Sequence, residues 1–180
     1  MKAVTKKQPP GTIEKAMVKI SLPQHLQDLN EWINGRRVKS APLLNHEKKG
    51  NVVLFYGSKK SGKHTIATML ASHAGKELYR VYLSKLVSKY IGETEKNISA
   101  LFKLAEAKDH ILFFDEADAL FGKRSEVKDA HDKYANLEVS YLIQKIEAYN
   151  GLVILSATRR SNIDKAFQRK LPFAIHFPSA

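Results

Sequence analysis

Nine residues from Gly57 to Thr65 have the types and the spacing that bind phosphate groups. The stretch reads GSKKSGKHT and fits the pattern G-x-x-x-x-G-K-[ST] at all but its last position. In such a loop, backbone N–H groups at a helix N-terminus surround the anion, and glycines let the backbone approach it. The lysine of the pattern, here Lys63, reaches the β- and γ-phosphates. The expected binding residues are Gly57, Ser58, Lys59, Lys60, Ser61, Gly62, Lys63, His64 and Thr65.

The loop departs from this pattern where a metal would bind. His64 stands in place of the hydroxyl that normally coordinates Mg²⁺. Thr65 supplies a hydroxyl one residue later, turned by roughly 100° on a helix, and we expect it to serve the metal. Lys60 adds a second charge beside Lys59. The alternative interpretation is a lysine-rich surface turn that binds no nucleotide.

Two adjacent carboxylates, Asp115 and Glu116, follow the apolar run Ile111–Phe114. In nucleoside triphosphatases with this layout, the aspartate belongs to the Mg²⁺ shell and the glutamate polarises the attacking water. Carboxylates that leave a buried strand are costly unless a cation or another partner is present. The alternative is that they cap the next segment, 117–120, where negative charge favours a helix N-terminus. We favour the catalytic interpretation because the phosphate loop and the strand-end carboxylates both indicate the same kind of nucleotide site.

The elements that must position these residues alternate between strand and helix. Apolar runs predict strands at 52–56, 78–83, 111–114, 152–155 and 173–177. Helical spacing of apolar residues between these runs is typical of βαβ units around a buried parallel sheet. Ligands of such sheets bind outside the carboxyl ends of the strands. Both the loop and the carboxylates lie at such ends.

Composition narrows the function classes without choosing one. The 180 residues carry 30 Lys and Arg against 18 Asp and Glu, a net charge of +12 that suits an anionic partner. The absence of cysteine excludes disulfides, cysteine zinc sites and a thiol nucleophile. No membrane span and no secretory signal stand out, so we expect a cytoplasmic protein without a membrane partner. A nucleic-acid partner is not expected, because basic side chains often only form a solvated surface.

The stretch ILFFDEADALFGKR, with SKYIGETEKN before it and SNIDKAFQRK after it, resembles the AAA+ ATPase family, and most closely its bacterial members. The resemblance covers residues 50–178. It implies a three-layer αβα P-loop NTPase fold with a mostly parallel five-stranded sheet. Residues 1–49 would then be a basic lead-in with a linker helix, and 50–180 the nucleotide-binding domain. The sequence ends at Ala180, where the family continues into a helical lid, so we expect the large subdomain alone.

The resemblance also implies roles for single residues. Lys63 matches the phosphate-loop lysine, Asp115 the metal-shell aspartate and Glu116 the catalytic glutamate. Thr158 matches a polar sensor of the γ-phosphate that is commonly Asn, and a threonine has a shorter reach. Arg169 matches the arginine finger that reaches a neighbouring subunit's nucleotide, although it could also be a solvated cation at a helix end.

The segment Tyr90-Ile91-Gly92 matches the pore loop with which remodelling members grip a polypeptide. Tyr90 could instead pack over the following helix. The resemblance thus implies a homo-oligomeric ring that uses ATP and Mg²⁺ to remodel a protein client. The alternatives are a degenerate scaffolding relative with weak or no hydrolysis, favoured by His64 and Lys60, and a basic nucleic-acid-binding protein.

Overall fold

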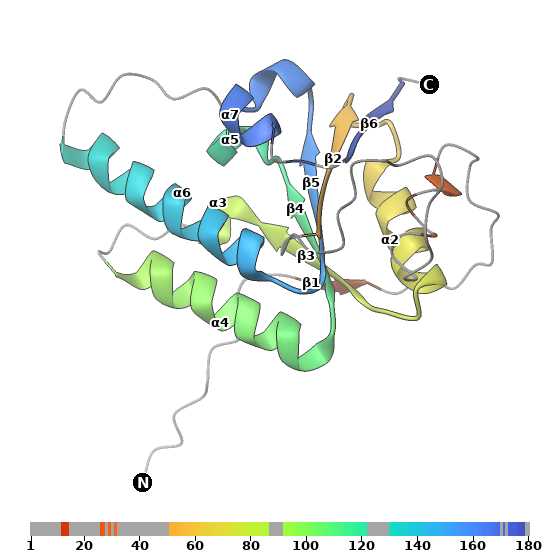
Figure 1. Cartoon of the computed structure of the whole chain (residues 1–180), viewed down its shortest axis with the longest axis horizontal. Coiled ribbons are helices and arrows are strands. Elements are labelled where there is room, and N and C mark those ends of the chain that lie inside the picture. The colour runs from red at the N-terminus through yellow and green to blue at the C-terminus, as the bar shows by residue number, and fades with distance from the viewer. Residues whose placement is uncertain are drawn as a thin grey trace, which may run out of the picture.

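A six-stranded sheet forms the centre of the molecule. The computed structural model describes residues 12–14, 26–27, 29, 31, 51–86, 92–121, 130–169, 171 and 173–178. The strand order is β1-β3-β4-β5-β2-β6 (Figure 1). The strands are β1 (Thr12–Glu14), β2 (Asn51–Gly57), β3 (Leu78–Tyr82), β4 (Ile111–Asp115), β5 (Leu152–Ala157) and β6 (Phe173–Phe177).

Strands β2 to β6 pair in parallel, which confirms the five predicted strands and the α/β class. The sequences of these strands are nearly continuous apolar runs because helices cover both faces of the sheet. Strand β1 was not predicted from the sequence, and it pairs antiparallel with β3 through Thr12↔Arg80. This short strand lies within the segment expected to be a basic lead-in.

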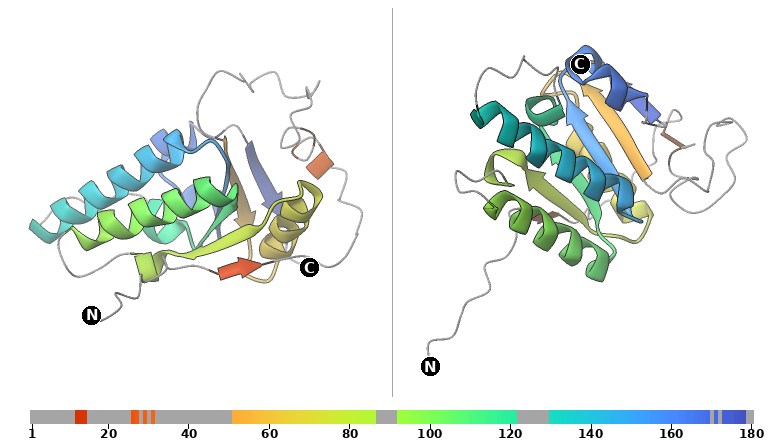
Figure 2. Two further views of the ribbon diagram at one scale, coloured as in Figure 1. Left: turned by 90° about the horizontal axis from the view of Figure 1, so that it is seen from below. Right: turned by 60° about the vertical axis from the view of Figure 1, so that its left-hand side comes forward.

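Helices cover the sheet in two layers. Helix α2 (Lys63–His73) lies on one face, and α4 (Glu93–Lys108) and α6 (Ala130–Ala148) lie together on the other (Figures 1 and 2). Side chains of β4 alternate between the layers: Phe113 belongs to the core beside α2, whereas Leu112 and Phe114 belong to the core beside α4 and α6. The result is the predicted three-layer αβα arrangement.

Short elements follow the carboxyl ends of the strands. They are α3 (Leu83–Leu86) after β3, α5 (Asp118–Phe121) after β4, and η2 (Arg160–Asn162) with α7 (Lys165–Gln168) after β5. Helix α2 begins beyond the carboxyl end of β2 and α5 beyond that of β4, so the phosphate loop and the residues that follow β4 lie at the same end of the parallel strands (Figure 1). Within the described residues, no helix has the length and apolar character to cross a membrane.

Candidate nucleotide-binding site

The predicted phosphate loop connects the end of β2 to the start of α2. Strand β2 ends at Gly57 and the helix begins at Lys63, with Gly62 as its N-cap in a left-handed conformation (φ 78°). Gly57 also has positive φ, at 151°, and a Cβ there would lie 2.0 Å from the carbonyl oxygen of Phe177 in β6. Glycine at 57 is therefore required by the close approach of β6, and glycine at 62 by the turn into the helix.

Lys63 lies across the loop with its side chain buried. Its Nζ atom donates hydrogen bonds to the carbonyl oxygens of Gly57, at 2.7 Å, and Ser58, at 2.6 Å, and a longer one to Ser61 Oγ, at 3.4 Å. Burial lowers the pKa of Lys63, while the charges of Asp115 and Asp118 act to raise it. The ammonium group thus lies inside the loop, within electrostatic reach of the carboxylates that follow β4.

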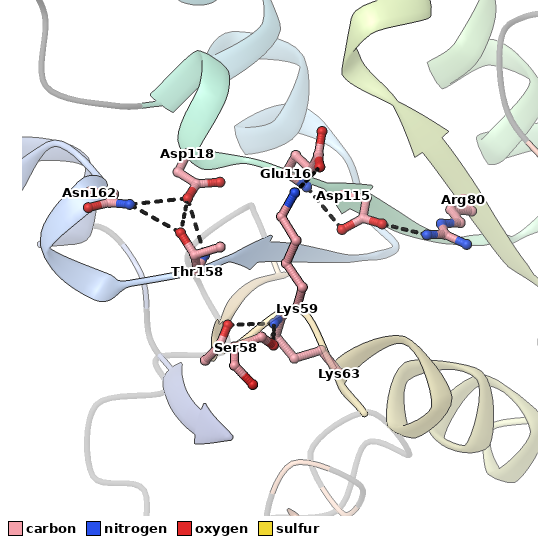
Figure 3. Close-up of polar contacts among 10 residues, drawn as sticks. Ser58, Lys59, Lys63, Arg80, Asp115, Glu116, Asp118, Thr158 and Asn162 are labelled. Carbon is pink, nitrogen blue, oxygen red and sulfur yellow. Dashed lines mark hydrogen bonds and ion pairs between the residues drawn. The ribbon is translucent and has the colours of Figure 1, made fainter. Parts of the chain in front are cut away.

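Each predicted catalytic carboxylate contacts a cation (Figure 3). Asp115 Oδ2 accepts a hydrogen bond from a guanidinium nitrogen of Arg80 at 2.6 Å, and both side chains are about three-quarters buried. Glu116 Oε1 lies 3.2 Å from Lys59 Nζ, and both of these side chains are mostly exposed. The structure therefore brings the loop and the strand end together, because a loop cation contacts a strand-end carboxylate.

Glu116 has a left-handed backbone conformation, with φ at 54°. Its backbone N–H donates to Asp115 Oδ1 at 3.0 Å, so Asp115 uses one carboxylate oxygen for the chain turn and the other for Arg80. A non-glycine residue at positive φ is uncommon and costs free energy. The turn directs the Glu116 side chain toward the phosphate loop, where Lys59 meets it.

Thr158, the expected sensor, lies in a hydrogen-bonded cluster with Asp118 and Asn162. Its hydroxyl and its backbone N–H both donate to Asp118 Oδ2, the latter at 3.2 Å. Asn162 Nδ2 lies 3.2 Å from both Asp118 Oδ2 and Thr158 Oγ1. Burial alone would raise the pKa of Asp118, but the hydrogen bonds from Thr158 and Asn162 outweigh it and hold the pKa below its usual value.

The side chains at the metal position do not form the donor set that Mg²⁺ prefers. Magnesium takes oxygen ligands in octahedral geometry. The His64 imidazole instead packs edge-on against Phe113, with the ring centroids 5.4 Å apart, and Thr65 is exposed. Asp115 is already paired with Arg80. Among the described residues, no group of three or more His, Asp or Glu side chains could hold a metal. A metal-binding role of Thr65 stays a prediction.

The other predicted residues lie outside this cluster. Arg169 follows α7 and is exposed, and its backbone N–H donates to the carbonyl of Lys165 at 3.3 Å. Gly92 precedes α4 as its N-cap in a left-handed conformation (φ 79°). Tyr90 and Ile91 lie outside the described residues. The arginine finger and the pore loop therefore stay predictions.

The site residues predicted from the sequence did not include Arg80, Asp118 and Asn162. Asp118 stands three positions after Asp115 in the same motif, and this spacing could have drawn attention to it. Arg80 has no such local signal. It reaches Asp115 because β3 and β4 pair with Arg80 opposite Phe113 and Tyr82 opposite Asp115.

The parallel sheet, the loop from β2 to α2 and the carboxylates beyond β4 together define a P-loop NTPase fold. The family model described as "ATPase family associated with various cellular activities (AAA)" matches residues 53–179. This chain belongs to the AAA family.

Relatives with curated descriptions agree with this assignment. "26S proteasome regulatory subunit 7 homolog B" of Arabidopsis thaliana is 37% identical over 141 residues, which are 71% of this chain and 30% of the relative. "Fidgetin-like protein 1" of Caenorhabditis briggsae is 33% identical over 139 residues, which are 71% of this chain and 23% of the relative. The chain thus spans less than a third of the length of these proteins.

A solved structure, "Crystal structure of FIGL-1 AAA domain", superposes with a TM-score of 0.58 at 24% identity. The match covers 72% of this chain and 43% of the other. It shows that the two share a fold.

Proposed function

We propose that this chain binds ATP through residues 57–65 and hydrolyses it slowly, as the nucleotide-binding part of a ring-forming AAA assembly. The observation that carries the proposal is the position of Lys63. Its ammonium group lies across the loop on the carbonyls of Gly57 and Ser58, at the N-terminus of α2. A cation and a helix N-terminus at one point favour an anion of high charge, such as a triphosphate.

The loop carries further positive charge for such a ligand. Lys59 and Lys60 are exposed, and each could turn to the phosphates as they arrive. Binding of phosphate oxygens by Lys59 would release Glu116, the residue proposed to polarise the attacking water. Catalysis of this kind depends on positioning and on electrostatic stabilisation of the transferred phosphoryl group.

Slow turnover is proposed because two features oppose hydrolysis. The family's metal-binding hydroxyl is replaced by His64, and Asp115 is held in an ion pair with Arg80. Members of the AAA family generally bind ATP with Mg²⁺, and the metal supplies charge stabilisation at the phosphates when it is bound. If turnover is absent, these features favour the second candidate function, a scaffold that binds nucleotide without hydrolysing it.

Assembly and client binding are proposed from the family. The exposed position of Arg169 is compatible with reaching a neighbouring subunit's nucleotide. The segment 90–92 would grip a protein client in the pore of the ring. One relative is by its name a subunit of the 26S proteasome, which supports action on proteins within an assembly. We also propose a cytoplasmic location.

Calorimetric titration with ATP tests the binding proposal. We expect saturable binding that Lys63→Ala weakens by about 100-fold or more, because an ammonium bound to phosphate is a strong charge-assisted contact. Lys103→Ala, on the exposed side of α4, removes the same charge at a distance and should leave the affinity unchanged. Absence of binding by the unmodified chain would refute the proposal.

Phosphate release tests the turnover proposal separately. We expect slow release that Glu116→Gln lowers further while ATP stays bound, because the variant keeps the shape of the side chain and loses the base. If Glu116→Gln releases phosphate at the unmodified rate, Glu116 does not polarise the water.

A further inference from the structure

We infer that ATP binds to this site without Mg²⁺, because Arg80 supplies at Asp115 the positive charge that a metal would otherwise supply. Arg80 would act through Asp115, as a residue that sets the metal dependence of binding without touching the nucleotide. This inference rests on the proposed ATP binding, and its test separates failure of the one from failure of the other.

The ion pair between Arg80 and Asp115 is short and partly shielded from water. The two side chains are 26% and 27% exposed, and the contact measures 2.6 Å. A charge-assisted hydrogen bond of this length is stronger than one between neutral groups, and partial burial reduces screening by salt. The guanidinium carbon also lies 5.1 Å from the centre of the Tyr82 ring, which helps to fix its orientation. Arg80 is therefore held in place before any ligand arrives.

The charge of Asp115 would oppose ATP binding if it were unpaired. Asp115 and Asp118 lie near enough to Lys63 to act on its pKa, so they also lie near the phosphates that Lys63 would bind. Like charges repel by several kcal/mol at an effective dielectric of about 20 when they lie about 4 Å apart. A metal-dependent site removes this repulsion by placing the cation between carboxylate and phosphates. Here Arg80 already neutralises the carboxylate.

The position of His64 supports the same conclusion independently. It occupies the place of the metal-binding hydroxyl, and its ring lies against Phe113 on the α2 face of the sheet. Imidazole is a ligand for zinc, copper, iron and nickel, whereas Mg²⁺ selects carboxylate, carbonyl and water oxygens. An imidazole thus stands at the position of one oxygen ligand for Mg²⁺, and the other ligand, Asp115, is held in an ion pair.

The test is a titration of the full chain with ATP, once with excess MgCl₂ and once with EDTA. For the unmodified chain we expect dissociation constants that agree within about threefold. Arg80→Met leaves the Asp115 charge unpaired, so its affinity should fall by about tenfold or more in EDTA and recover in Mg²⁺. Lys103→Met, an equal loss of charge at a distant exposed position, should stay independent of the metal.

A variant without the Asp115 carboxylate separates the effect of Arg80 on ATP binding from the effect of the metal. Asp115→Asn should bind ATP in EDTA at least as tightly as the unmodified chain, because position 115 then carries no negative charge to oppose the phosphates. The double variant Arg80→Met with Asp115→Asn should restore metal-independent binding, since neither partner is left unpaired. Circular dichroism and thermal melting establish that each variant is folded. If Arg80→Met is unfolded, the unmodified chain and Asp115→Asn still decide the question.

The outcomes are distinct. Binding in both buffers, with metal dependence appearing only in Arg80→Met, supports the inference. If the unmodified chain binds ATP only with Mg²⁺, the inference is overturned and the proposed function stands. The same conclusion follows if Asp115→Asn loses affinity for ATP when Mg²⁺ is present. No binding in either buffer overturns the proposed function and the inference with it.

Discussion

The Nζ atom of Lys59 lies 3.2 Å from Oε1 of Glu116, so a cation of the phosphate loop contacts the carboxylate proposed to polarise water. The two side chains are 77% and 67% exposed. Exposed ion pairs contribute little to stability, and this one can exchange its partner readily. An arriving phosphate group would compete with Glu116 for Lys59, which couples occupation of the loop to release of the base.

Lys59→Met should therefore separate binding from turnover. We expect a higher KM for ATP, because a loop cation is lost, and a kcat at least equal to that of the unmodified chain, because Glu116 is no longer paired. Lys60→Met removes the same charge from the next position and should raise KM without raising kcat. Steady-state phosphate release measures both constants. A lower kcat in Lys59→Met would show that Lys59 serves the reaction directly.

Thr158→Val should destabilise the fold by about 1–3 kcal/mol, because Asp118 loses a hydroxyl donor in a partly buried site. The hydrogen bond lowers the pKa of Asp118, so its contribution is present at neutral pH and is lost as the pH falls through the folded-state pKa of that carboxyl. Thr158→Ser keeps the hydroxyl and is the matched control. Urea denaturation at pH 7 and at a series of pH values below 3.8 measures the difference. An equal effect at every value would mean that lost packing, and not the hydrogen bond, is responsible.

Gly57→Ala should cost more than about 3 kcal/mol, since a Cβ would meet the Phe177 carbonyl at 2.0 Å in addition to the positive φ. Gly62→Ala has open space around the new Cβ. It should cost only the free energy of holding alanine in a left-handed backbone conformation, about 1–2 kcal/mol. Both glycines belong to one loop, so each variant controls for the other. Urea midpoints give the comparison, and equal costs would contradict the close approach of β6.

His110 should make the fold sensitive to mild acid. It is 2% exposed and stacks on Tyr79, and neither ring nitrogen has a hydrogen-bond partner among the described residues. Burial lowers its pKa from the usual 6.5, and Glu77, 3.9 Å away, offsets this in part. The unfolded chain therefore takes up the proton first, so stability falls as the pH drops below 6.5, by up to about 1.4 kcal/mol per pH unit.

His110→Leu should remove this pH dependence, and His73→Asn on the exposed end of α2 should not. Thermal melting at pH 7.5 and pH 5.5 measures it. The same loss of stability in His110→Leu as in the unmodified chain would assign the effect to other groups.

Much of the fold could be predicted from the sequence. The parallel strands were evident because buried strands between two helical layers are apolar throughout. The phosphate loop was evident because it depends on glycines and a lysine at fixed local spacing. The short strand Thr12–Glu14 was missed, since three residues at the edge of a sheet carry no periodic pattern. The roles of Tyr90, Ile91 and Arg169 stay predictions.

The sequence alone determined the chemistry available at this site: glycines that bend a loop, lysines within it, and carboxylates at the end of a buried strand. The tertiary structure decided how those charges are paired. Arg80 meets Asp115 across 35 residues of chain, Lys59 meets Glu116 across 57, and Thr158 meets Asp118 across 40. Such partners depend on the register between strands, which is set by burial of the whole sheet and not by any local pattern.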